Sequence, residues 1–445
     1  MGHSYKHVKV ASDFTQELLC EYITLSKEIA YKSKDAALGK ALLSECSNIA
    51  VSHVFSQLNV TVKTHKKAGA VVFRPIHAAH NSPFRPAMRW LSHCLKPTLK
   101  KDFLLKDTRQ LVTLLNNHKF PKDVVFIKFD IKDFFLSGVH EEIVELSNKN
   151  VAESTRKDYI SMCRWILGAQ YVALDPTSES AWQVVVGSGM GLTCSPDLSN
   201  STFLQLVEVD WAAVPSVQQQ HGILLYTRYM DDGLIIAHNV PHLYQGFLDE
   251  LARKGKFFVV EIESISKDFV SMLDIQMFKG PRFQHTGYLD YKVATKPTNI
   301  SQPLLCSSSH SGSVHSSWPQ AMLQRVDELC SSPALAIVEK KKLLEIWSRN
   351  NIIVKRNVLR PVRRRTDQVV RLNLNFDPVW AKAGLGKFLH EFGYRWASTF
   401  ASTSVPKALG ISWSNGGRHT SQILKSMHEW RHAESEDWRI WRPRL

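Results

Sequence analysis

The chain has 445 residues, a formal net charge of +15 and 44% hydrophobic residues, which is typical of a core-forming protein with a basic surface and an anionic partner. Its seven cysteines, an odd number without a Cys-x-x-Cys pair, argue against a disulfide framework and indicate a reducing compartment. No signal peptide is evident and no apolar run reaches the roughly 18 residues of a membrane helix, so no membrane partner is expected.

In chain order, the apolar patterns predict an α+β protein. Residues 1–54 have helical spacing, through Leu18, Leu19, Tyr22 and Ile23, and are expected to form a helical N-terminal extension. The middle of the chain alternates between two patterns, with strands near residues 124–129, 222–238, 257–263 and 271–278 and helices near residues 139–149, 153–167, 197–212 and 241–253. This alternation predicts a sheet covered by helices on one face.

A Ser-rich stretch, residues 301–317, precedes a basic C-terminal region with helical patterns near residues 318–330, 334–350, 378–392 and 420–432. From Ser331 to Leu445 there are 21 Lys and Arg against 9 Asp and Glu, an excess of 12 out of the net charge of +15. Basic runs alternate there with tryptophans, namely Lys340–Lys342 and Arg363–Arg365 with Trp347, Trp380, Trp396, Trp413, Trp430, Trp438 and Trp441. This mixture suits a nucleic-acid duplex. The alternative is that the tryptophans form a core.

One spacing in this part of the chain is typical of metal ligands: Cys306, His310 and His315, with Cys330 beyond. Four such side chains could hold zinc. The spacing is irregular and the surrounding sequence is rich in serine, so a loop is the favoured interpretation.

The most informative motif is Tyr229-Met230-Asp231-Asp232, because apolar residues flank it on both sides. The flanks, residues 223–226 and 234–237, predict a β-hairpin with two carboxylates at its tip. Adjacent carboxylates repel each other by about 4 kcal/mol at an effective dielectric constant of roughly 20. A divalent cation such as Mg2+ relieves this repulsion and keeps coordination positions open for phosphate. The alternative is an ordinary solvated turn, because Asp favours turns.

A third carboxylate, Asp130, closes a second run of strand-forming residues. A strand that ends in Asp beside a hairpin that ends in Asp-Asp is the arrangement that a two-metal phosphoryl-transfer site needs. Asp130 and Asp231 are predicted to bridge the metals, and Asp232 to tune the site from its edge. Asp133 is expected to be a solvated or helix-capping residue instead.

Further motifs occur in the order found in a known family. The segments that agree are Val62–Lys66, Phe73–Ile76, Asn81–Pro83, Asp130–Phe135 with Val139–Glu142, Gly189–Pro196, Tyr229–Asp232, Met272–Ile275 and Lys296–Asn299. With these motifs, which span roughly residues 60–315, the chain resembles the reverse transcriptases of Penelope-like retroelements, which are relatives of telomerase. Such elements usually carry a C-terminal nuclease of the GIY-YIG type, and no such segment can be read here. The chain is therefore expected to resemble a member without the nuclease, or a truncated copy.

The resemblance implies a right-hand polymerase fold of the α+β class, with fingers, a palm built on an antiparallel sheet, and a helical thumb. Residues 1–54 would be the N-terminal extension, residues 55–300 the fingers and palm, and residues 301–445 the thumb. The implied activity is that of an RNA-directed DNA polymerase, which extends a DNA primer on an RNA template and consumes deoxynucleoside triphosphates. A nuclear location is expected, with weak support from the basic runs.

The resemblance also implies roles for individual residues. Two Mg2+ ions, with Mn2+ as a substitute, would be held by Asp130, Ile131, Asp231 and Asp232. Residues expected at the nucleotide are Lys63, Arg74, Phe134, Phe135 and Gly191, and those expected at template and primer are Tyr229 and Met230. Lys63 and Arg74 would neutralise the triphosphate, Phe135 would clash with a 2′ hydroxyl, and Gly191 would leave room for the template or the base. The alternatives are solvated surface cations, core phenylalanines and an ordinary turn glycine.

A competing hypothesis is a polymerase-derived scaffold that binds nucleic acid without catalysis. Such scaffolds usually lose an acidic ligand, whereas all three carboxylates are present here. An RNA-templated RNA polymerase is a further alternative, and the bulky Phe135 argues against it.

Overall fold

The structure is a computed structural model that describes residues 4–10, 13–33, 36–44, 54–62, 73–174, 180–294, 304, 308, 310, 312–349, 369–375 and 408–414. Contacts divide the chain into two units, one made of Met1–Ile300 with Leu329–Glu339 and the other of Ser301–Glu328 with Lys340–Leu445. Helices and sheets are both present in the first unit, and the predicted α+β class is confirmed.

A five-stranded sheet forms one part of the first unit, in the order β1-β6-β5-β2-β3. Its strands are Tyr5–Lys9 (β1), Ser56–Val62 (β2), Phe73–Ala78 (β3), Tyr171–Ala173 (β5) and Ser180–Val184 (β6). Neighbouring strands are antiparallel except β2 and β5, which are parallel. The pattern of residues 1–54 predicted only helices, so β1 is an addition to the expected fold.

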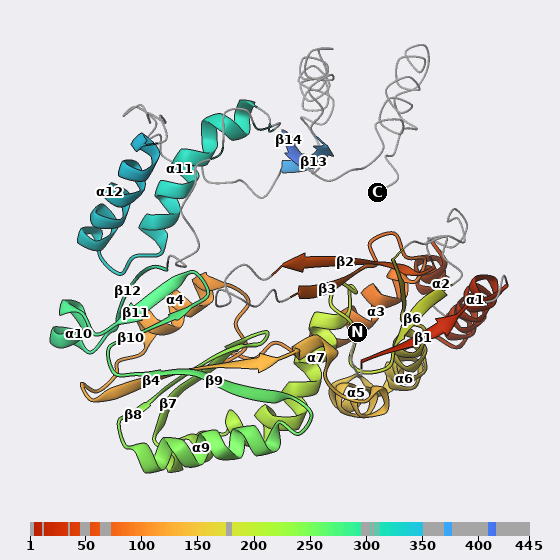
Figure 1. The fold of residues 1–445 in the computed structure, drawn as a ribbon, viewed down its shortest axis with the longest axis horizontal. Coiled ribbons are helices and arrows are strands. Elements are labelled where there is room, and N and C mark those ends of the chain that lie inside the picture. The colour runs from red at the N-terminus through yellow and green to blue at the C-terminus, as the bar shows by residue number, and fades with distance from the viewer. Residues whose placement is uncertain are drawn as a thin grey trace, which may run out of the picture. The chain divides into compact units, whose positions relative to one another are not determined.

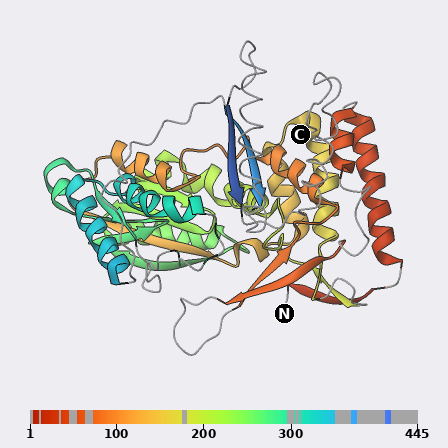
Figure 2. The same cartoon turned by 90° about the horizontal axis from the view of Figure 1, so that it is seen from above.

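Helices cover this sheet around a shared apolar core. The two N-terminal helices that the sequence predicted are α1 (Phe14–Ser33) and α2 (Ala36–Leu43), and the hydroxyl of Tyr22 in α1 donates to the carbonyl of Leu42 in α2. Their core is shared with α3 (Arg85–Leu95), α5 (His140–Ser147) and α6 (Glu153–Gly168). Figure 2 shows α1 and α2 in red beside the orange α3 and the yellow α6.

The central sheet of the first unit is antiparallel, in the order β7-β8-β4-β9. Its strands are Val124–Lys132 (β4), Ile223–Tyr229 (β7), Asp232–His238 (β8) and Val259–Ser266 (β9). Successive residues of a strand point to opposite faces. Val125, Ile127 and Phe129 of β4 therefore share one face, which packs against α7 (Ser195–Phe203), the π-helix η4 (Leu204–Ala212) and α9 (Pro241–Lys254).

The opposite face of the central sheet is covered as well. Val124 and Phe126 pack there with α4 (Thr108–Asn117) and with a three-stranded sheet of Phe269–Met272 (β10), Ile275–Phe278 (β11) and Asp290–Val293 (β12). Figure 1 shows α9 on one side of the central sheet and β10–β12 with α4 on the other. The predicted helical layer on one face is present, and the opposite face is covered in addition because the start of β4 is apolar on both faces. Further helices in the described part of residues 1–300 are η2 (Phe134–Leu136), η3 (Asn148–Asn150), α8 (Pro215–Gln220) and α10 (Pro281–Thr286).

The C-terminal region contains α11 (Gly312–Glu328) and α12 (Pro333–Arg349), at the positions of two predicted helices. In the second unit, the rings of Trp318 and Trp347 meet edge to face at 4.9 Å, and Trp347 is only 1% exposed. Trp347 is therefore a core residue rather than a base-stacking one. A parallel pair of strands, β13 (Val369–Asn375) and β14 (Ala408–Ser414), was not predicted.

Helices predicted near residues 378–392 and 420–432 lie outside the described residues. Within the described ranges, no helix combines the length and the apolar content needed to cross a bilayer.

The packing of β4 against β8 predicts that Gly233→Ala destabilises the central sheet. An added Cβ would lie 1.9 Å from the ring of Phe129, its cross-strand partner, so the ring or the strand must move. We expect a loss of about 2 kcal/mol in the free energy of unfolding, measured by urea denaturation. Gly168→Ala is the control, because an added Cβ there has no neighbour within 4 Å. Equal stabilities of the two variants would contradict this packing.

Candidate functional site

The motif Tyr229–Asp232 forms the predicted hairpin turn. Strand β7 ends at Tyr229, β8 begins at Asp232, and these two residues pair with each other, which leaves Met230 and Asp231 as a two-residue loop. Met230 has a φ of 53°, in the left-handed region that tight hairpin loops require. The hairpin with two carboxylates at its tip is thus confirmed.

Asp130 lies next to this turn, because β4 pairs with β8. Asp130 is directly opposite Asp232, and the amide of Ile131 donates to the carbonyl of Asp231 at 3.0 Å. The expectation that Asp130 ends its strand is wrong by two residues, since β4 continues to Lys132, which pairs with Val259 of β9. Backbone hydrogen bonds, rather than a shared loop, hold the three carboxylates together.

A cleft of about 310 Å³ opens beside these strands. Its walls come from β3, from the end of β4 with η2, from the hairpin turn and from β9: Phe73, Arg74, Pro75, Asp130, Ile131, Lys132, Asp133, Phe134, Phe135, Leu136, Met190, Asp231 and Glu261. Six predicted site residues line this cleft, namely Arg74, Asp130, Ile131, Phe134, Phe135 and Asp231. Asp232, Gly191, Tyr229 and Met230 are not among its lining residues, and Lys63 lies outside the described residues.

Four acidic residues line the cleft, namely Asp130, Asp133, Asp231 and Glu261, together with two cations, Arg74 and Lys132. Burial and the nearby charges of Asp231, Glu263 and Asp232 together raise the pKa of Asp130 to about 6, against the opposing effect of Lys128. The pKa of Asp231 is raised too, by burial and by Asp232, although Arg74 and Arg228 oppose the shift. A cation in the cleft would favour the ionised form of both groups.

Asp232 forms an ion pair with a lysine on the same face of the sheet. The ammonium of Lys128 lies 3.4 Å from a carboxylate oxygen of Asp232 and 2.7 Å from one of Glu263. Burial disfavours the charge of Lys128, but the ion pairs with Glu263 and Asp232 outweigh it and raise the pKa of the ammonium. In the described part of the chain, no three His, Cys, Asp or Glu side chains form a cluster that could hold a metal ion.

Lys128 and Glu263 were both missed from the sequence. Lys128 precedes Asp130 by two residues, so the period of a strand places it on the same face, and this signal was available. The position of Glu263 could not have been predicted from the sequence, because an irregularity in the β4–β9 register between Lys128 and Phe129 places Glu263 beside Lys128.

The two phenylalanines after Asp133 have different environments. Phe134 is 2% exposed and packs in the core, whereas Phe135 is half-buried at the cleft. They belong to the helical turn η2. Asp133 precedes this turn with a φ of 48°, and its exposed side chain makes no capping hydrogen bond.

Gly191 has a structural requirement that the sequence did not reveal. Its φ is 115°, and an added Cβ would lie 2.3 Å from the carbonyl oxygen of His77 in β3. The amide of His77 also donates to the carbonyl of Met190 at 2.7 Å. The loop before α7 is therefore joined to the strand that carries Arg74.

No protein-family model matches the chain, and no curated protein matches it. Among solved structures, the telomerase from Candida albicans in complex with a fragment of telomeric RNA is 10% identical, covers 77% of this chain and has a TM-score of 0.47. The apo telomerase from Candida tropicalis is 11% identical, covers 67% of this chain and has a TM-score of 0.41. The RNA-dependent RNA polymerase of a human picobirnavirus is 13% identical, covers 66% of this chain and has a TM-score of 0.42. The chain spans 60%, 58% and 55% of these three proteins, respectively.

The burial of His77 predicts a loss of stability in acid. Burial lowers the pKa of His77 to about 4, whereas the unfolded chain has the ordinary value of 6.5. Between pH 6.5 and pH 4 the unfolded state therefore binds more protons, and the free energy of unfolding falls as the pH falls. His77→Gln, which can still bond to Tyr5, removes this contribution of about 3 kcal/mol. Urea denaturation across this range tests the prediction, and parallel curves for the two proteins would contradict it.

Proposed function

We propose that the protein is an RNA-directed DNA polymerase that extends a DNA 3′ end on an RNA template by two-metal nucleotidyl transfer. The supporting observation is the cleft that Asp130 of β4 and Asp231 of the hairpin turn line together with Arg74. Two carboxylates with raised pKa values beside a cationic side chain fit a site for a metal-bound triphosphate.

The donor set fits Mg2+, which binds through one or two carboxylates and takes its other ligands from water and substrate phosphates. Asp130 and Asp231 would hold the ions, with Ile131 and Asp232 beside them. When bound, the two ions would lower the pKa of the primer hydroxyl and neutralise charge on the triphosphate and the leaving pyrophosphate. The protein positions these ligands through the ladder between β4 and β8.

Arg74 is proposed to bind the triphosphate. Its side chain is exposed at the cleft, and its charge lowers the pKa of Asp231, so the two residues interact electrostatically. A planar guanidinium can bind two phosphate oxygens at once. Lys63 is assigned the same role from the family resemblance alone.

The remaining assignments are extensions of this proposal. The five-stranded sheet and its helices would be the fingers, the central sheet the palm, and the basic C-terminal region the thumb. Tyr229, Met230 and Gly191 would contact template, primer or base, and the protein would act in the nucleus. The Penelope-like family remains the proposed identity of this polymerase, with RNA template, DNA primer and deoxynucleoside triphosphates as its partners.

Primer extension on RNA and DNA templates, with deoxy- and ribonucleotides in parallel, tests the activity. We expect Mg2+-dependent extension with deoxynucleotides on RNA. Binding of primer–template without extension would favour the non-catalytic scaffold, and extension with ribonucleotides alone would favour an RNA polymerase.

Asp130→Asn or Asp231→Asn should reduce Mg2+-dependent extension at least about 100-fold, because each removes a charged ligand from the cleft. Binding of primer–template, measured by fluorescence anisotropy, should remain nearly unchanged. Asp249→Asn is the matched control, because the carboxylate of Asp249 is exposed in α9, does not line the cleft, and accepts from Gln245 through an oxygen that Asn retains. Near wild-type extension by either of the first two variants would sink the two-metal assignment.

Phe135→Ala should relax the discrimination against ribonucleotides more than it lowers deoxynucleotide incorporation. The ring of Phe135 lines the cleft five residues after Asp130, where it can meet a 2′ oxygen. The ratio of kcat/KM for deoxy- and ribonucleotides is the measurement. If that ratio is unchanged in Phe135→Ala but changed in Phe134→Leu, the steric gate lies at the deeper ring.

A further inference from the structure

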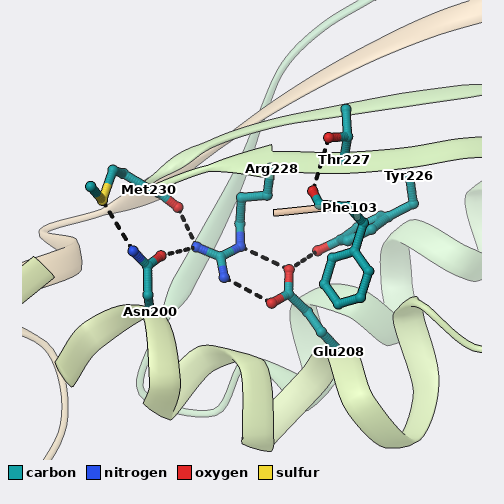
Figure 3. Close-up of polar contacts among 7 residues, drawn as sticks. All are labelled: Phe103, Asn200, Glu208, Tyr226, Thr227, Arg228 and Met230. Carbon is teal, nitrogen blue, oxygen red and sulfur yellow. Dashed lines mark hydrogen bonds and ion pairs between the residues drawn. The ribbon is translucent and has the colours of Figure 1, made fainter. Parts of the chain in front are cut away.

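A fully buried ion pair lies behind the hairpin turn (Figure 3). Arg228 of β7 and Glu208 of η4 are both 0% exposed. The Nε and Nη2 groups of Arg228 donate to the two carboxylate oxygens of Glu208, each at 2.8 Å. Such a paired geometry is the strongest form of charge-assisted hydrogen bonding.

The third nitrogen of this guanidinium reaches the turn itself. Nη1 of Arg228 donates to the carbonyl of Met230 at 2.5 Å and to the amide oxygen of Asn200 at 2.7 Å. The amide nitrogen of Asn200, in α7, then contacts the sulfur of Met230 at 3.1 Å. Both the backbone and the side chain of Met230 are therefore held from behind the sheet, as Figure 3 shows.

The surroundings leave the guanidinium little freedom. Its central carbon lies 4.8 Å from the ring centre of Phe203 and 5.7 Å from that of Phe134. Burial disfavours its charge, but Glu208 outweighs burial and keeps the pKa of Arg228 above the ordinary value. Glu208 comes from a π-helix, a rare conformation that often occurs at functional sites.

A buried ion pair is a poor way to gain stability, because apolar residues of similar volume often serve as well. An apolar pair, however, could not form the hydrogen bonds that this ion pair forms. Two edges of the guanidinium are used, one for Glu208 and one for the carbonyl of Met230. The ammonium of a lysine has no planar fork and could not satisfy both partners in these directions.

We infer that Arg228 is a positioning residue that fixes the Met230 carbonyl and thereby the direction in which Asp231 presents its carboxylate to the cleft. This inference rests on the proposed function, because it gives the ion pair a role in metal binding. Arg228 itself touches neither the cleft nor a substrate; it acts through the peptide that joins Met230 to Asp231. Its absence should therefore lower metal affinity and kcat without a comparable change in the KM for nucleotide.

The test replaces the pair by apolar residues, Arg228→Met with Glu208→Leu, in the full chain. Mn2+ binding, followed by electron paramagnetic resonance, should weaken at least tenfold, and kcat for primer extension should fall by a similar factor, while the thermal midpoint stays near that of the wild type. Arg228→Lys, which keeps the charge, should show the same loss of Mn2+ affinity. Asn200→Ala should lower Mn2+ affinity several-fold. Because it removes no charge from the core, this variant is the test if the double variant does not fold.

Tyr226→Phe is the matched control. Its hydroxyl donates to the same Glu208 at 2.8 Å but has no bond to the turn, so Mn2+ affinity should be unchanged. Wild-type Mn2+ affinity and kcat in the folded double variant, or in Asn200→Ala if the double variant does not fold, would overturn the inference while the proposed function stands. If the wild type itself neither binds Mn2+ nor extends a primer, the proposed function fails and the inference fails with it.

Discussion

Unbalanced negative charge at one end of the central sheet is the constraint on which the site depends. Asp130 and Asp231 share a cleft with Asp133 and Glu261, and the opposing cations among the described lining residues are Arg74 and Lys132. Repulsion between two such carboxylates amounts to about 4 kcal/mol at an effective dielectric constant of roughly 20. The apolar part of the same strands opposes it, because burying Phe126, Ile127, Leu234 and Ile236 contributes about 1.5–3 kcal/mol for each side chain.

Two cations on opposite faces of the sheet both contact the acidic turn. Lys128 is partly exposed on the face of Asp130 and draws Asp232 and Glu263 to itself. Arg228 lies on the helical face and binds the turn through a carbonyl. Lys128 thus neutralises part of the charge of Asp232 and Glu263, and Arg228 restrains the peptide that joins Met230 to Asp231. The electrostatics of the site therefore depend on the positions of these two cations as well as on the positions of the carboxylates.

The sequence was sufficient where short-range rules decide the structure. The hairpin follows from apolar alternation on either side of a turn and was predicted correctly, and the strand of Asp130 was predicted with its end two residues too early. Features that depend on pairing between strands far apart in the chain could not be predicted from the sequence. One example is β1, whose partner strand in the sheet, β6, lies 170 residues away in the chain. The engagement of Asp232 by Lys128 and Glu263 depends on the register between β4, β8 and β9, which a single strand cannot reveal.

The backbone bond between His77 and Met190 has a mechanical consequence. Strand β3 presents Arg74 to the cleft, and the same strand is joined three residues later to the loop that leads into α7. Gly191 allows the two backbones to approach closely. The strand that carries Arg74 at the cleft is therefore tied to the loop that leads into α7, the helix that bears Asn200, so that one backbone contact links the elements on the two sides of the acidic turn.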